Sequence, residues 1–352
     1  MLKALHKLRG LAALIVALSH LAHWQDIPNL YWKFRIIGLG TQAVCVFFVI
    51  SGFIIARTHS REVGKIDRLS PYAIKRFLRL YPAYWFYSLL SLSLGALGFW
   101  SIDTSNLGHR TPLELISAIT LLPISNNQFG FILVSWSLFY EILFYLVFSF
   151  FFFGRKYGIA VLFLFIFLSL INHEYWLVKN FCFNHQNLLF LLGVLIGFNF
   201  DSLRGLPVPP WLLLAVGASL YLAFVWIGSD KIWPMSYFAA TCLVSGAVLL
   251  DIRSGNASAP AVPWIEKTLL WFGSISYSLY LCHVPAQAIV FAFFGRPFNS
   301  VLALPFFVLT PIAMASLTYL WIEYPMQKLA RKLTGKKLQT IPGVSETIAH
   351  TP

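Results

Sequence analysis

Charged residues are scarce in this sequence of 352 residues. They make up 11% of it, whereas a soluble globular domain carries about 25%. Acidic residues are the scarcer kind, with 13 aspartates and glutamates against 26 lysines and arginines. This shortage excludes an ordinary soluble domain. Because the sequence contains no basic soluble domain either, binding of nucleic acid is not expected.

Cysteine is rare as well, and its positions show no pattern. No two of the four cysteines have the spacing of a zinc site or of a disulfide-rich module. We therefore expect no disulfide framework and no bound metal. Internal repeats of fixed period are also absent, although many membrane carriers are built from such repeats. The cysteines are Cys45, Cys182, Cys242 and Cys282.

Long hydrophobic runs fill the sequence instead, and hydrophobic residues make up 58% of it. A run of about 20 apolar residues spans the hydrocarbon core of a bilayer as a helix. The sequence thus predicts an all-α integral membrane protein, a bundle of about ten transmembrane helices. Residues 112–123 are apolar but too short to span, so we expect an interfacial or re-entrant piece there. The ten stretches are 8–24, 36–56, 78–100, 131–153, 157–172, 186–200, 210–228, 232–250, 268–294 and 301–322.

The placement of lysine and arginine predicts the orientation. With ten spans and a cytoplasmic N-terminus, 20 of the 26 basic residues fall on the cytoplasmic side. This asymmetry follows the positive-inside rule and places both termini in the cytoplasm. A signal peptide within residues 1–20 is the alternative, but its cleavage would invert the remaining spans and spoil the charge count. We expect one transmembrane domain over residues 1–330 and a basic, polar cytoplasmic tail over 331–352.

Arg9 and His20 stand out within the first apolar stretch. Eleven residues of helix turn by about 1100°, which brings His20 to within about 20° of the face that carries Arg9. The rise between them is about 16.5 Å, roughly half the hydrocarbon thickness. Ionisable groups at such depth usually face a bundle interior or a wet cavity. The pair therefore predicts an active site that extends from the cytoplasmic surface into the membrane.

Arg76 and Arg79 lie three positions apart, so a helix would place them on one face at the start of the third stretch. Two guanidinium groups together suit a phosphate-bearing ligand, because each can bond it bidentately. The other interpretation is a plain positive-inside anchor.

Glu141 is a carboxylate near the outer end of the fourth stretch, at a depth similar to that of His20. It needs a cationic or hydrogen-bonding partner there. One interpretation is that Glu141 orients His20, and the other is a structural pair with Arg35 or Arg110.

The ninth stretch carries Tyr277, Tyr280 and His283 at three-residue spacing, which places neighbouring members on a shared helix face. These three residues are candidates for a substrate cavity, although His283 can also be a hydrogen-bonded structural histidine. Glu323, at the cytoplasmic end of the tenth stretch, is expected to pair with the basic cytoplasmic loop from Arg57 to Arg79 rather than with substrate.

Read together and in order, these blocks resemble the membrane-bound acyltransferase-3 family over nearly the whole chain. No single piece is specific, but six pieces in register are. They are Leu8-Arg9-Gly10 with His20, Phe47 to Phe53, Arg76-Phe-Leu-Arg79 with Pro82, Trp136-Ser-Leu-x-x-Glu141, Ser276 to His283, and Glu323-x-Pro325.

The resemblance implies a ten-span enzyme of the bacterial inner membrane, with acyl-CoA as donor substrate and no bound cofactor. The acyl group, which we expect to be acetyl, would pass to a sugar hydroxyl of a surface polysaccharide or lipid-linked glycan. Arg9, Arg76 and Arg79 would bind the phosphates of CoA. His20 would act as general base, for which an imidazole pKa near 6.5 is suited, with Glu141 orienting it.

Two alternatives remain open at this stage. An acyl-histidine intermediate is a variant of the same chemistry. A carrier of an anionic solute or of acyl groups would also need ionisable residues along its path. The chain resembles the standalone type of the family, without the SGNH-type esterase domain that many members carry. Besides acyl-CoA and a glycan, the expected partners are membrane lipids.

Overall fold

The computed structural model describes residues 2–23, 30–98, 110–125, 130–175, 183–227, 233–254, 262–294 and 303–335. Throughout these residues the secondary structure is helical, and no strand occurs in them. Every one of the ten predicted stretches coincides with a helix of the structure. The predicted all-α class is therefore confirmed.

The helices differ widely in length, and a five-residue π-helical turn, Tyr319–Glu323, joins the last two of them. In chain order they are α1 (Lys3–Ser19), α2 (Leu30–His59), α3 (Leu69–Ala96), α4 (Pro112–Thr120), α5 (Trp136–Ser149), α6 (Arg155–Tyr175), α7 (Asn187–Phe198), α8 (Pro210–Ile227), α9 (Trp233–Ser254), α10 (Pro263–Phe294), α11 (Leu304–Thr318) and α12 (Tyr324–Leu333).

By length and composition, seven helical segments in the described part of the chain are able to cross a membrane. The expected spans outside this group are those on α1, α3 and α7. Helices α1 and α7 have only 17 and 12 residues. Helix α3 is longer but carries Arg76 and Arg79 in its first half. The multi-pass membrane bundle is confirmed, whereas the count of ten spans and the cytoplasmic placement of the termini stay predictions.

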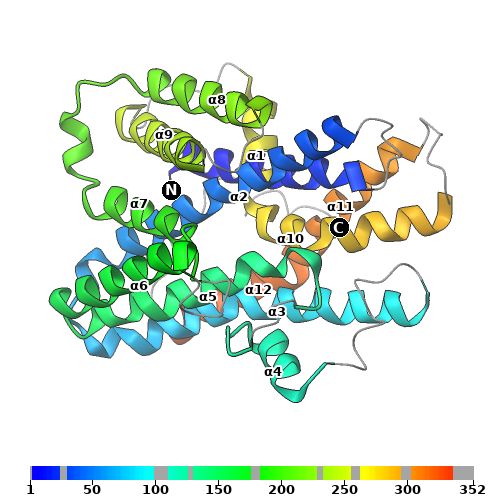
Figure 1. Cartoon of the computed structure of the whole chain (residues 1–352), viewed down its shortest axis with the longest axis horizontal. Helices are drawn as coiled ribbons and strands as arrows, with labels where there is room; N and C mark the ends of the chain where they lie inside the picture. Colours follow the sequence, from blue (N-terminus) through cyan, green and yellow to red (C-terminus); the bar gives the residue numbers. More distant parts are fainter. Residues whose placement is uncertain are drawn as a thin grey trace, which may run out of the picture.

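The short helix α4 lies beside α3 (Figure 1). Aromatic side chains of α3 bind carbonyl groups at the end of α4. The last carbonyl groups of a helix have no partner within the helix. Here Tyr84 donates to the carbonyl oxygen of Ala118 at 2.5 Å, and Trp85 donates to that of Ile119 at 3.0 Å. This pairing explains why α3 holds tyrosine and tryptophan where a lipid-facing helix would hold leucine.

Helices α1, α2 and α10 form the centre of the bundle (Figure 1). Helix α2 packs on α1, α7 and α9, and α10 packs on α1, α3 and α11. Helices α8 and α9 form a pair at one edge. Helix α12 lies along α3. The candidate site residues sit on α1, α3, α5 and α10, so they converge at this centre.

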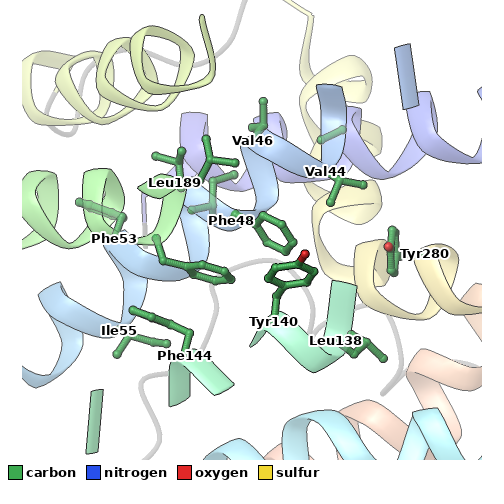
Figure 2. Close-up of a cluster of buried hydrophobic side chains, with 14 of the residues drawn as sticks. Val44, Val46, Phe48, Phe53, Ile55, Leu138, Tyr140, Phe144, Leu189 and Tyr280 are labelled. Atoms are coloured by element: carbon green, nitrogen blue, oxygen red, sulfur yellow. The ribbon is translucent and has the colours of Figure 1, made fainter. Parts of the chain in front are cut away.

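An aromatic cluster joins α2, α5 and α7 beside the centre. Phe190 of α7 stacks on Phe48 and on Phe144, with ring centroids 4.7 and 4.5 Å apart. Figure 2 shows Phe48 of α2 facing Tyr140 of α5, and their centroids are 5.8 Å apart. Aromatic pairs at such distances stabilise a core beyond the area they bury. The cluster therefore fixes α5, and with it Glu141, against α2.

Two glycines allow α1 and α10 to approach at backbone distance. A Cβ atom on Gly10 would lie 2.5 Å from the backbone nitrogen of Gly273. A Cβ atom on Gly273 would lie 2.5 Å from the carbonyl oxygen of His6. Small residues at a helix crossing permit this approach in membrane bundles. The neighbouring residue Arg9 thereby reaches the backbone of α10.

We predict that Gly10→Ala destabilises the protein by about 1–3 kcal/mol, because the added methyl group forces α1 away from α10. The measurement is thermal unfolding of the purified protein in detergent. Gly38→Ala on α2 is the matched control, since its Cβ would have no atom within 4 Å. Equal melting temperatures for the two variants would contradict the close contact.

Candidate active site

The N-terminus of α1 is held by a carboxylate from α9. The N–H groups of Ala4 and Leu5 donate to the two carboxylate oxygens of Asp251 at 2.8 and 3.1 Å. The first N–H groups of a helix lack partners within the helix, and a negative charge there complements the helix dipole. Asp251 therefore fixes the start of α1, and through it the position of Arg9 one to two turns later.

Arg9 reaches from α1 to the backbone of α10. Its Nη2 atom donates to the carbonyl oxygen of Gly273 at 2.5 Å. Its Nε atom is buried and has no hydrogen-bond partner among the described residues. A guanidinium group offers five N–H donors and cannot give up its charge. Arg9 therefore retains donor capacity for an anionic group.

Arg9 and Arg79 line the same pocket, which lies between α1, α2, α3, α5 and α10. Its space, including the opening to solvent, is about 670 Å³. The lining consists of Arg9, Val44, Phe47, Phe48, Ile50, Ser51, Ile54, Arg79, Leu80, Ser137, Leu138, Glu141, Tyr145, Ser276, Tyr277 and Tyr280.

Glu141 is the acidic residue of this lining. Its Oε1 atom accepts hydrogen bonds from Tyr145 on the same helix and, at 3.3 Å, from Ser51 of α2. Its charge also acts on Arg9 and Arg79. The pocket thus combines two guanidinium groups with one carboxylate. Of the two arginines considered as partners of Glu141, Arg110 donates to the carbonyl oxygen of Gly130 at 3.4 Å, and the side chain of Arg35 lies outside the described part of the structure.

Arg76 lies apart from Arg79, although both are on α3. It does not belong to the pocket lining. Its Nη2 atom lies 3.3 Å from Nε2 of His59, and its guanidinium carbon lies 5.4 Å from the ring centroid of Tyr145. Tyr145 itself lines the pocket. Of the predicted pair, Arg79 therefore lines the pocket, whereas Arg76 lies against the ring of a lining residue.

His20 faces His283 from the end of α1. The two rings meet edge to face, with centroids 4.7 Å apart. Nδ1 of His20 lies 2.9 Å from the carbonyl oxygen of Val16, and Nδ1 of His283 lies 3.1 Å from that of Leu279. A carbonyl oxygen only accepts, so each Nδ1 carries its proton. In the neutral form, each Nε2 then holds a lone pair that can accept a proton.

Tyr277 and Tyr280 both line the pocket from α10. Tyr277 donates to the carbonyl oxygen of Leu80 at 2.8 Å. Tyr280 bonds Ser137 of α5 at 2.6 Å, and Figure 2 shows its ring reaching from α10 toward the side chains of α2 and α5. The ring centroid of Tyr280 is 6.1 Å from that of His283. His20 and His283 do not line the pocket, so Tyr280 is the lining residue that connects the pocket to the histidine pair.

A family model described as an acyltransferase domain, acyltransferase-3, matches residues 2–321. The chain belongs to the acyltransferase-3 family. No curated protein and no solved structure matches it. The family and the apolar helices together identify a multi-pass membrane acyltransferase.

The match encloses every candidate site residue of this acyltransferase, from Arg9 to His283. The structure brings Arg9, Arg79, Glu141 and the two tyrosines together in one pocket, and it brings His20 and His283 together beside it. The contacts described for Glu141 do not include His20, so the orienting role of Glu141 stays a prediction, as do the roles of the other residues.

Several polar residues at or near the pocket are not predicted from the sequence. Tyr145 follows Glu141 by four positions, a spacing that places both on one helix face, and this signal was available. Ser51 lies within the block from Phe47 to Phe53, but nothing in the sequence indicates that its hydroxyl bonds a carboxylate of another helix. Asp251 and His59 gave no signal, because their partners on α1 and α3 are distant in sequence.

The sequence predicts that Glu323 pairs with the basic loop, but the hydrogen bonds described for it come from a serine of α10. Glu323 is only 4% exposed, at the end of the π-helical turn, and accepts hydrogen bonds from the backbone N–H and the hydroxyl of Ser278. Its charge acts on Arg79 and Arg9. The partner described for it is thus a serine of α10, with electrostatic attraction to the arginines of the site.

Ser278→Ala is expected to lower the free energy of unfolding by about 1.5–3 kcal/mol, because a buried carboxylate loses a charge-assisted hydrogen bond. Thermal unfolding of the purified acyltransferase measures this. Ser91→Ala is the matched control, since the buried hydroxyl of Ser91 has no hydrogen-bond partner among the described residues. If Ser91→Ala costs as much as Ser278→Ala, the hydrogen bond to Glu323 is not what stabilises this region.

Proposed function

We propose that this acyltransferase moves an acyl group from cytoplasmic acyl-CoA to a sugar hydroxyl of an extracytoplasmic polysaccharide or lipid-linked glycan. Acetyl-CoA is the donor we favour, and the product is then an O-acetylated glycan. The enzyme would act in the inner membrane of a bacterium, in contact with membrane lipids. Acyl-CoA is a substrate in this proposal, and no bound cofactor takes part.

The observation that carries the proposal is the pocket shared by Arg9 and Arg79. Two guanidinium groups in one pocket suit the phosphates of CoA, because each offers several donors to an anion. The buried Nε atom of Arg9, which has no partner among the described residues, is a donor that a phosphate oxygen would satisfy. Arg76 also has a buried Nε atom without a partner in the described chain. It would add a third cation next to the pocket.

His20 is the proposed general base. Its Nδ1–H is engaged with Val16, so Nε2 is the nitrogen that would take the proton of the acceptor hydroxyl. The hydroxyl oxygen would then attack the thioester carbonyl, and the carbon–sulfur bond would break. The proton held by His20 would pass to the CoA sulfur, which leaves as the free thiol. Glu141 and His283 would support His20, and Tyr277 and Tyr280 would line the path of the acyl group.

The positions of Arg9 on α1 and of His20 at its end support transfer across the membrane. Arg9 and His20 are separated by about 16.5 Å of helix rise. If the phosphates of acyl-CoA bind at Arg9, its thioester end would therefore extend along α1 to the histidine pair. The acyl group would pass Tyr280 on this route. The donor would therefore enter from the cytoplasm, and the acceptor would approach from the outer side.

We predict that His20→Ala lowers the rate of acyl transfer by about 10²–10⁴-fold, the contribution of a general base. The measurement is release of CoA thiol from acetyl-CoA by purified protein in nanodiscs, with glycan acceptor present. Unchanged expression and melting temperature are the control. Near-normal turnover in this variant would refute the role of His20. A wild-type protein that consumes no acyl-CoA would favour a carrier.

Replacing Arg79 with Ala is expected to weaken acyl-CoA binding by about 10- to 100-fold, the loss of one charge-assisted phosphate contact. Arg79→Lys should rescue only part of this loss, because lysine lacks the planar fork. Isothermal titration with acetyl-CoA measures the effect, and the KM for the acceptor should change little. Arg110→Ala is the control, since Arg110 contacts Gly130 and Phe131 away from the pocket. Equal affinities for the Arg79→Ala and Arg110→Ala variants would make Arg79 a topological anchor.

A further inference from the structure

His59, near the cytoplasmic end of α2, is a buried histidine outside the pocket lining. It is only 1% exposed. Its ring meets the rings of Tyr72 and Phe152 edge to face, with centroids 5.1 and 5.7 Å apart. A polar ring enclosed by aromatic side chains needs hydrogen-bond partners for both nitrogens. Both ring nitrogens of His59 have such partners, a carboxylate at Nδ1 and a guanidinium at Nε2.

The two partners fix the protonation pattern of His59. Nδ1 lies 2.5 Å from the carboxylate of Glu62, and Nε2 lies 3.3 Å from Nη2 of Arg76. A carboxylate accepts, so Nδ1 carries the proton, whereas a guanidinium only donates, so Nε2 offers its lone pair. Glu62, His59 and Arg76 therefore form one directed chain of hydrogen bonds. Because both nitrogens of the ring are engaged, the ring cannot rotate without breaking a bond to a charged group.

At the other end of this chain, Arg76 is confined by two rings. Its guanidinium carbon lies 5.5 Å from the ring centroid of Tyr72 and 5.4 Å from that of Tyr145. Tyr145 lines the pocket and donates to Glu141. The buried Nε atom of Arg76 has no hydrogen-bond partner among the described residues. The side chain is thus held by one nitrogen, while the Nε–H group has no partner among the described residues.

We propose that His59, itself oriented by Glu62, is a positioning residue that holds Arg76 in the geometry in which it binds a phosphate of acyl-CoA. An arginine side chain has several rotatable bonds, and fixing them before the ligand arrives lowers the entropic cost of binding. His59 does this from outside the pocket and touches neither donor nor acceptor. The inference rests on the proposed role of Arg76 in donor binding.

The test distinguishes the hydrogen-bond acceptor of His59, its Nε2 atom, from the packing of its ring. His59→Phe keeps an aromatic ring in the aromatic enclosure but loses the lone pair at Nε2. His59→Gln supplies an amide oxygen near the same place. We expect His59→Phe to weaken acetyl-CoA binding, and to raise its KM, by about tenfold. The kcat and the KM for the acceptor should change less than twofold, and His59→Gln should restore most of the affinity.

A double-mutant cycle with Arg76→Ala decides whether His59 acts through the arginine. If it does, His59→Phe in the Arg76→Ala background causes no further loss of acetyl-CoA affinity. His185→Phe is the matched control, because His185 is also hydrogen-bonded and stacked, to Tyr237 and Trp233, but lies in the turn before α7 and does not line the pocket. It should leave acetyl-CoA affinity unchanged.

Several outcomes overturn the proposal, and they are distinguishable. Equal loss for His59→Phe and His59→Gln, or additive losses with Arg76→Ala, would make His59 a packing residue. Full affinity in His59→Phe, with a loss in Arg76→Ala, would refute the role of His59 alone. Full affinity in both single variants would show that Arg76 does not bind the donor, which refutes that part of the proposed function as well.

Discussion

The placement of two partly buried cations, Arg9 and Arg79, in one pocket is the electrostatic constraint on which the centre of this bundle depends. The two charges repel each other, and neither guanidinium can neutralise itself by losing a proton. Taking such charges out of water costs several kcal/mol each unless opposite charges and hydrogen bonds compensate for it. The carboxylates of Glu141 and Glu323 act on both arginines and supply that compensation. These four charges come from α1, α3, α5 and the turn after α11, so their mutual balance fixes the arrangement of those elements.

The rigid and the adjustable parts of the site follow from how α1 is held. Its N-terminal half is capped by Asp251 and packed by backbone contact at Gly10, both of which are inflexible attachments. Its C-terminal end carries His20, whose partners are a carbonyl of its own helix and the ring of His283. The end of α1 that carries Arg9 is therefore held through its backbone by α9 and α10, whereas the partners of His20 are a carbonyl of its own helix and one ring of α10.

The helices of this protein could be predicted from sequence because a membrane demands long apolar segments with internally satisfied backbones. Each of the ten predicted stretches overlaps a helix of the described residues, and both Arg9 and Arg79 face the interior of the bundle at the pocket. Periodicity gives the direction of a side chain but not the neighbour that it meets. It could not show that Arg79 lines the pocket while Arg76 meets His59, because His59 approaches from α2. The cap on α1 escaped prediction for the same reason, because Asp251 is about 250 positions away.

The π-helical turn before α12 has a consequence for the spacing of residues in this region. A π turn holds one residue more than an α turn, and such turns are rare and often lie at functional sites. Each residue of an α-helix accounts for about 100° of rotation. Loss of one residue from Tyr319–Glu323 would restore an unbroken α-helix from α11 into α12, and it would turn everything on one side of the deletion by about that angle. Glu323 and the basic face of α12 then could not both keep their present directions. Chain length at this turn is therefore constrained independently of residue identity, and insertions or deletions here should be far less tolerated than substitutions.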